Sequence, residues 1–203
     1  MAIAARGAVA DVIVGVTATA ATERVYAPWG QDRAVSHTVD GSGLDAGTGG
    51  HTTVPDGFMW LSENGAAPGT AGAPVADQWI KFDLGALFSD VTMRIWNYNE
   101  TLLVDRGLRD MVVLVSATDA PDIGDWVSLG PTTLAKAPGD SSTDFSETFS
   151  LGTGPIRYVY FDIGTNHGSS EGLVGLSEVQ FTPEPATLSL LTLGAFALLR
   201  RRK

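Results

Sequence analysis

Residues 78–85 of this 203-residue chain read QWIKFDLG, an alternation of apolar and polar side chains that predicts a β-strand. Such alternation is typical of a strand, because successive side chains point to opposite faces of its sheet. Similar runs recur at residues 11–20, 89–97, 109–118, 125–129, 143–150, 156–163 and 173–182. The sequence therefore predicts about eight strands.

The spacing of these strands and the composition favour an all-β fold. Turn-forming clusters of Gly, Pro and Asp separate many of the runs, the chain has 24 Gly and 10 Pro, and no helical repeat precedes residue 186. One domain with tails fits the length. We expect a two-sheet, jelly-roll-like β-sandwich over residues 11–182, interrupted by one long loop at 40–76 in which residues 58–61 are strand-like.

Charge and residue types exclude several functions. Thirteen bases oppose 23 acids, and residues 11–182 alone carry 8 bases and 22 acids, so nucleic acid is not an expected partner. The chain has no cysteine and therefore no disulfide, thiolate nucleophile or Cys-ligated zinc. His37, His51 and His167 lack metal-ligand spacing, and no nucleophile elbow or phosphate loop occurs. The many carboxylates single out no catalytic pair, so we predict no catalytic residue and no enzyme.

The last part of the chain, residues 183–203, has three features in a fixed order. Pro183, Glu184 and Pro185 are followed by the apolar run 186–199, and the chain then closes with a basic cluster. That cluster is Arg200, Arg201, Arg202 and Lys203. The run is apolar around its whole circumference, so we expect a membrane-seeking hydrophobic helix, and the basic cluster would stay on the cytoplasmic side.

This tail resembles the PEP-CTERM sorting domain of bacteria with a Gram-negative type of envelope. The resemblance implies export, processing by an exosortase-type transpeptidase associated with exopolysaccharide production, and at least transient membrane anchoring at the cell envelope. Export also requires a signal at the other end of the chain. Ala8-Val9-Ala10 has the form of a cleavage site, so we expect residues 1–10 to be the remnant of a longer signal peptide.

The body of the chain resembles the discoidin, or coagulation factor 5/8 type C, family of galactose-binding-like domains. The matching segments are VDGSG at 39–43, QWIKFDLG at 78–85, MRIWNYN at 93–99, Arg106-Gly107 leading into VVLVS at 112–116, and GLSEVQF at 175–181. The resemblance implies a structural Ca²⁺ between the early loop, with Asp40 and Ser42, and the final strand, with Glu178. The alternative is that Asp40 only shapes a turn and Glu178 is solvated.

Aromatic and polar side chains in predicted loops or at strand ends are candidates for binding a sugar, because rings stack on its C–H faces and polar groups bind its hydroxyls. These are Trp29, Trp60, Asn97, Tyr98, Asn99, Arg106 and His167. By contrast, Trp79, Trp96 and Trp126 lie inside predicted strands and are expected in the core.

The leading hypothesis is a non-catalytic surface or matrix protein whose domain binds polysaccharide or another glycan. Two alternatives stay open: a structural surface protein without a specific ligand, and an envelope glycoside hydrolase.

Overall fold

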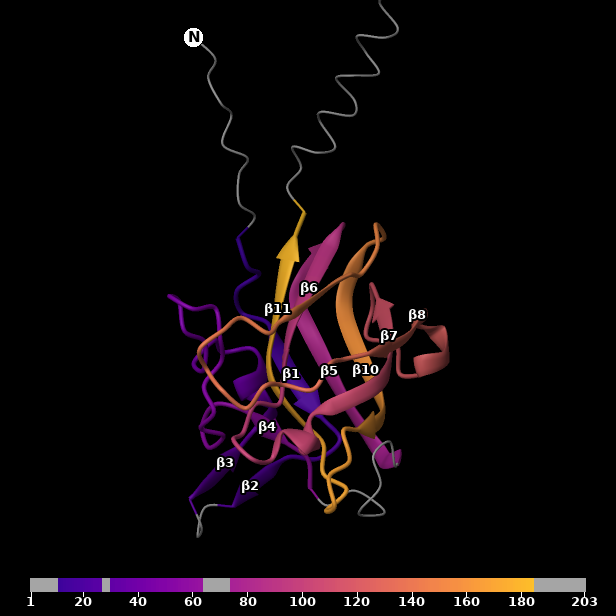
Figure 1. Ribbon diagram of the computed structural model, residues 1–203. Helices are drawn as coiled ribbons and strands as arrows, with labels where there is room; N and C mark the ends of the chain where they lie inside the picture. Colours follow the sequence, from indigo (N-terminus) through magenta and orange to yellow (C-terminus); the bar gives the residue numbers. More distant parts are fainter. Residues whose placement is uncertain (1–10, 27–29, 64–73, 185–203) are drawn as a thin grey trace, which may run out of the picture.

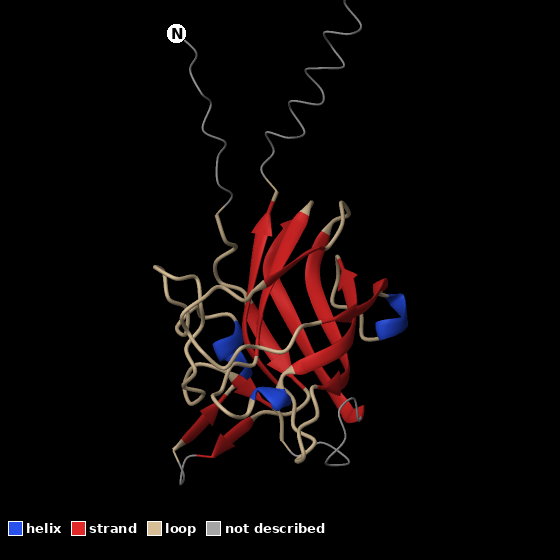
Figure 2. Ribbon diagram, viewed as in Figure 1, coloured by secondary structure: helices blue, strands red, loops and turns tan. Residues whose placement is uncertain are grey.

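The computed structural model describes residues 11–26, 30–63 and 74–184 (Figure 1). Two antiparallel sheets form a β-sandwich (Figure 2). The larger sheet has the order β1 (Thr17–Ala20), β5 (Pro74–Phe88), β10 (Ile156–Asn166), β7 (Leu108–Ser116) and β8 (Val127–Thr133). The smaller sheet has the order β4 (Trp60–Leu61), β11 (Gly175–Pro183), β6 (Val91–Asn97) and β9 (Glu147–Ser150).

A small hairpin and three short 3-10 turns complete the described fold. The hairpin pairs β2 (Arg24–Tyr26) with β3 (Gln31–Arg33). The turns are η2 (Val35–Thr38), η3 (Val104–Arg106) and η4 (Ile123–Asp125). The β2–β3 hairpin lies at the end of the sandwich opposite the end at which β11 stops (Figure 1). The β2–β3 hairpin and the end of β11, where the predicted sorting tail begins, are therefore far apart.

The core lies between the two sheets. Ile80, Phe82 and Leu84 are buried at 0–2% exposure. The Phe82 ring on β5 meets Phe161 of the same sheet at 5.1 Å and Phe181 of the opposite sheet at 5.3 Å between ring centroids, both edge to face. This arrangement is the favoured geometry for aromatic pairs, and it joins the two layers.

All eight predicted strand regions contain a strand, which confirms the all-β sandwich. Two further strands, β2 and β3, were not predicted, because they span only three residues each and carry no periodic signal. The strand-like stretch predicted at 58–61 contains β4. The long loop predicted at 40–76 contains β4, and its last residues already belong to β5.

One of the three predicted core tryptophans, Trp79, is not fully buried. Trp96 is buried within β6, as expected. Trp79 is only partly buried, and it stacks on Tyr160 of β10 with ring centroids 5.6 Å apart. Trp126 precedes β8 rather than lying within a strand, and it is buried against Tyr158 and Tyr160. Trp79 alternates with the buried residues Ile80 and Phe82 along β5, so it lies on the outer face of the sheet.

The predicted C-terminal helix and the N-terminal segment 1–10 lie outside the described residues. Among the described residues, no helix has the length and apolar character needed to span a bilayer.

Candidate functional site

Four charged and aromatic side chains form a partly buried network near the hairpin end. Arg33 at the end of β3 is 6% exposed and donates to the Tyr98 hydroxyl at 2.5 Å and to Glu100 at 3.2 Å. Tyr98 in turn donates to Glu100 at 2.5 Å, and Arg106 of η3 donates to the same carboxylate at 3.1 Å. Burial, reinforced by the hydrogen bond to Glu100, raises the pKa of Tyr98, which therefore stays protonated.

Two predicted ligand residues of the same region, Asn97 and Asn99, are buried and use their amides inside the protein. Asn97 donates to the carbonyls of Leu108 and Ala135 at 2.7 and 2.8 Å. Asn99 donates to the carbonyls of His51 at 2.9 Å and Asp140 at 2.7 Å. Because buried amides need such partners, these two side chains hold neighbouring loops together.

The remaining predicted ligand residues are distributed differently. Trp60 is fully buried in β4 and donates its indole N–H to the Thr22 carbonyl at 2.9 Å. His167 is half-buried, and burial, with the nearby charges of Lys136 and Arg109, lowers its pKa. Trp29 lies outside the described residues. The structure thus brings Tyr98 and Arg106 into one network and leaves Trp60 as a core residue.

A surface hollow on the hairpin was not identified from the sequence. Arg24 and Tyr26 of β2, Gln31 of β3 and Glu63 after β4 line a hollow of about 390 Å³. Tyr26 pairs with Gln31 across the hairpin and is 53% exposed. Arg24 lies two residues before Tyr26 and therefore on the same face of the strand. In the sequence, the alternation of Arg24 and Tyr26 is too short to indicate a strand, so the hollow could not be predicted.

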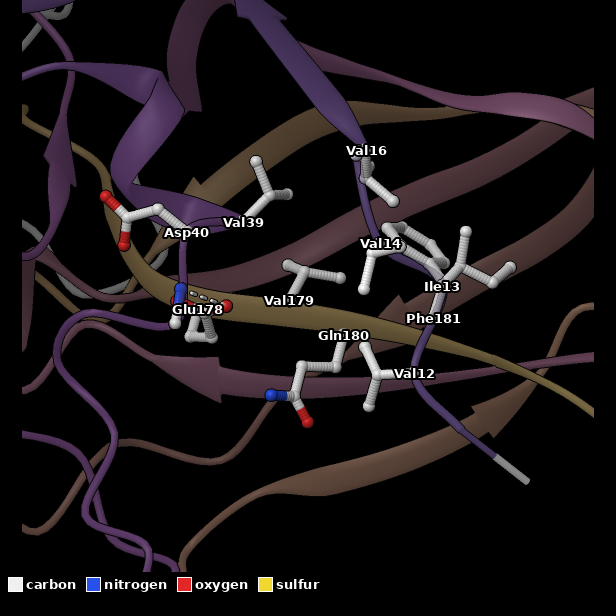
Figure 3. A pocket seen from close by; sticks show the side chains of 12 residues that line it. Val12, Ile13, Val14, Val16, Val39, Asp40, Glu178, Val179, Gln180 and Phe181 are labelled. Atoms are coloured by element: carbon white, nitrogen blue, oxygen red, sulfur yellow. Dashed lines mark hydrogen bonds between the residues drawn. The ribbon is translucent and has the colours of Figure 1, made fainter. Parts of the chain in front are cut away.

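Asp40 and Glu178 lie together in a second hollow of about 320 Å³, between the N-terminal segment, the loop after η2 and β11 (Figure 3). The register of β11 against β6 shifts between Leu176 and Glu178, a bulge that re-aims the side chains there. Glu178 is consequently 1% exposed, and both of its oxygens accept from the backbone N–H of Gly41 at 3.2 Å.

The pKa values of these two carboxyl groups are shifted in opposite directions. Burial, together with the neighbouring charge of Asp40, raises the pKa of Glu178 to about 8. Burial would also raise the pKa of Asp40, but its hydrogen bonds from Ser42 and His37 outweigh burial and lower it. Asp40 is therefore ionised at neutral pH beside a carboxyl group that retains its proton.

Asp40 and Glu178 could supply two of the oxygen ligands that a hard cation needs. A buried carboxyl with a single hydrogen-bond donor and a carboxylate neighbour is the environment that an added positive charge would stabilise. Within the described part of the chain, no group of three or more His, Cys, Asp or Glu side chains is placed to hold a metal. Further ligands would therefore have to come from Ser42, backbone carbonyls or water.

The start of the predicted sorting tail belongs to the folded domain. Pro183 is the last residue of β11, and Glu184 is bonded to the β5–β6 turn and to β6. Pro185, Arg200, Arg201 and Arg202 lie outside the described residues.

Comparisons with known proteins agree with both parts of this description. The PEP-CTERM protein-sorting motif matches residues 181–203. The sandwich resembles a family 32 carbohydrate-binding module of the Clostridium perfringens family 89 glycoside hydrolase, solved with GalNAc-β-1,3-galactose, with a TM-score of 0.55 and 11% identity over 85% of this chain and 99% of that one.

Two further solved modules are similar in size. One is the CBM32-3 module of a Clostridium perfringens family 31 glycoside hydrolase, with a TM-score of 0.53 and 11% identity over 86% of this chain and 95% of that one. The other is a chitosan-binding module of a Paenibacillus chitosanase/glucanase, with a TM-score of 0.51 and 19% identity over 81% and 92%. No curated protein matches the chain in sequence.

The likeness to a complete enzyme is partial. A structure of the Clostridium perfringens family 89 glycoside hydrolase matches with a TM-score of 0.53 and 15% identity, covering 85% of this chain, but the chain spans only 14% of that enzyme's length.

Fold and motif together define the class of the protein, which is a discoidin-like β-sandwich with the fold of family 32 carbohydrate-binding modules. This particular chain carries, at the end of that sandwich, a PEP-CTERM sorting motif, which marks it as an exported protein directed to the cell envelope.

Proposed function

We propose that this protein is a non-catalytic, surface-displayed glycan-binding protein that an exosortase-type enzyme sorts through its tail. The observation that carries the binding part is the hollow around Tyr26, at the end of the sandwich opposite the sorting motif (Figure 1). A domain attached to the envelope through its β11 end would present this hollow outward.

The chemistry of the hollow suits a sugar. Tyr26 is 53% exposed, and a tyrosine side chain can stack on the apolar C–H face of a pyranose. Arg24, Gln31 and Glu63 offer donors and acceptors for the surrounding hydroxyls. Trp29 lies between β2 and β3 in the sequence, and we retain it as a candidate contact together with Arg106 and His167. The modules of similar fold described as binding GalNAc-β-1,3-galactose and chitosan support a glycan as the ligand class.

The buried predicted residues take a supporting role in this proposal. Asn97 and Asn99 donate their hydrogen bonds to neighbouring loops, Tyr98 donates to Glu100, and Trp60 is buried in the core. Their contribution to binding would be the rigidity of the loop end, since preorganised loops lose less entropy when a ligand binds.

The tail would supply attachment. A helix over the 14 apolar residues 186–199 would span about 21 Å at ~1.5 Å per residue, against a hydrocarbon core of ~30 Å. Such a short span suits a transient anchor that the sorting enzyme later processes.

A structural Ca²⁺ held by Asp40, Ser42 and Glu178 is the proposed cofactor. Its role would be to join the early loop to the final strand, because the two carboxylates come from these two segments. The ion would supply positive charge beside the buried Glu178 and the exposed Asp40, and would take no part in glycan recognition.

A panel of immobilised glycans that includes GalNAc-β-1,3-galactose and chitosan tests the binding proposal. Tyr26→Ala should weaken binding by about tenfold, which corresponds to ~1.4 kcal/mol of ring contact. Trp79→Ala is the matched aromatic control, because Trp79 stacks on Tyr160 on the outer face of the larger sheet and does not line the hairpin hollow. Binding that depends on Trp79 and not on Tyr26 would move the site to that sheet face.

The alternatives give different results in the same assay. A structural protein without a specific ligand binds nothing on the panel. An envelope hydrolase releases reducing sugar from a glycan, and such turnover would contradict the non-catalytic assignment.

A further inference from the structure

Pro183 and Glu184, which begin the Pro-Glu-Pro sequence of the sorting motif, are bonded to the smaller sheet. Pro183 pairs with Val91 at the start of β6, and the ladder continues for one more bond, from the Glu184 N–H to the Asp90 carbonyl at 2.6 Å. In an antiparallel ladder, a bond between the residues flanking a pair marks that pair as non-hydrogen-bonded. Proline, which has no N–H, is therefore accommodated at residue 183 without loss of a sheet bond.

The Glu184 side chain is held as well. Its carboxylate accepts a hydrogen bond from the Thr92 hydroxyl at 2.7 Å. The carbonyl that binds the Glu184 N–H belongs to Asp90, which the tight β5–β6 turn holds at a φ of 55°. Both contacts come from one short stretch, residues 90–92, and they meet the backbone and the side chain of the same motif residue.

The chain leaves no spacer after these contacts. A single residue, Pro185, separates Glu184 from the apolar run 186–199. An enzyme that binds the motif next to the membrane needs access to its backbone, and β6 with the turn before it occupies one side of the backbone of Pro183 and Glu184.

We infer that the sorting motif is docked on β6, that the sorting enzyme engages it only after the end of β11 has separated from residues 90–92, and that Thr92 sets how often this separation occurs. This inference rests on the proposed sorting by an exosortase-type enzyme. It adds that the folded domain itself limits the rate of sorting, because local opening at a strand end must precede binding.

Amide hydrogen exchange of the full-length chain in detergent micelles tests the docking directly. The Glu184 amide should exchange more slowly than in an unstructured peptide. Thr92→Val keeps the shape of the side chain and removes its hydroxyl, so exchange at Glu184 should become about 2- to 10-fold faster. Thr92→Ser should restore slow exchange. Thr148→Val, an exposed threonine on β9 of the same sheet, is the matched control and should not change exchange at Glu184.

Processing of the same full-length variants in a host that makes the sorting enzyme tests the consequence. A four-residue Gly-Ser insertion between Thr182 and Pro183 releases the whole motif and should speed conversion of precursor to processed protein by more than Thr92→Val does. Equal conversion rates in wild type and the insertion variant would overturn the inference while leaving sorting intact. Conversion of none of the proteins would refute the sorting proposal, and this inference with it. An unprotected Glu184 amide in wild type would refute the docking by itself.

Discussion

The carboxylate of Glu178 on the last strand accepts, through both oxygens, a hydrogen bond from the backbone N–H of Gly41 in an early loop, at 3.2 Å. These residues are 137 positions apart in the chain. One donor serving two buried oxygens, with Asp40 adjacent, leaves the Glu178 carboxyl poorly compensated when ionised, and its raised pKa follows from this.

Calcium should stabilise the domain if Asp40 and Glu178 hold it. At free calcium ~100 times the dissociation constant, binding to the folded state alone contributes ~2.7 kcal/mol, which raises the melting temperature by roughly 5–10 °C in a domain of this size. Glu178→Gln should remove most of the shift. Differential scanning calorimetry with calcium, with magnesium and with chelator measures it, and identical melting temperatures in all three would eliminate the site.

Stability in chelator should fall as the pH rises from about 4.5 to about 8. The folded protein keeps the proton on Glu178 in this window, whereas the unfolded chain releases it near the usual value of 4.5. The contribution of Glu178 to the unfolding free energy is therefore complete below pH 4.5 and decreases by up to ~1.4 kcal/mol per pH unit above it.

Chemical denaturation of wild type and Glu178→Gln across this pH range isolates the effect of Glu178. The pKa of His37 is also raised, by Asp40 and Asp32 against the opposing effect of burial, so its contribution likewise decreases with pH. That contribution is common to both proteins. The difference between the two unfolding free energies should shift in favour of the variant as pH rises, and a constant difference would show that Glu178 titrates normally.

Gly175→Ala should destabilise the domain by about 1–3 kcal/mol or more through overpacking. A Cβ at residue 175 would lie 2.4 Å from the Tyr98 ring and 2.9 Å from the Trp60 carbonyl oxygen, so the side chains that support the loop end would have to shift. Gly154→Ala is the matched control, because a Cβ there meets nothing within 4 Å. Urea denaturation compares them, and equal midpoints would contradict the tight packing.

Removing the apolar and basic part of the tail should release the protein from the envelope. Deletion of residues 186–203 leaves Pro183 and Glu184 in their contacts with β6, so the folded domain is preserved while membrane affinity is lost. Fractionation of cells and medium measures the distribution. Retention of the truncated protein in the envelope would refute the anchoring role of the tail.

Much of the fold could be predicted because its signals are local. Alternation such as that from Ile80 to Leu84 reflects the two-residue period of one strand and needs no knowledge of its partner. The sorting motif is equally local, since its parts follow one another within residues 181–203. The short strands β2 and β3 carry too few residues for a periodic signal, and the hollow around Tyr26 was missed with them.

By itself, the sequence determined the all-β class of the protein, the positions of its main strands along the chain and the presence of a sorting tail, because each depends on neighbouring residues. Tertiary structure alone decided which polar and aromatic side chains are accessible. From the sequence, Tyr98 and Asn99 were predicted in loops or at strand ends, where they could bind a ligand. Both are buried, because Arg33 donates to the Tyr98 hydroxyl and Asn99 donates to the carbonyls of distant loops. Glu178 is buried for a related reason, since a bulge in β11 turns it toward a loop 137 residues earlier. Burial of a polar group depends on partners that only the folded chain brings within reach.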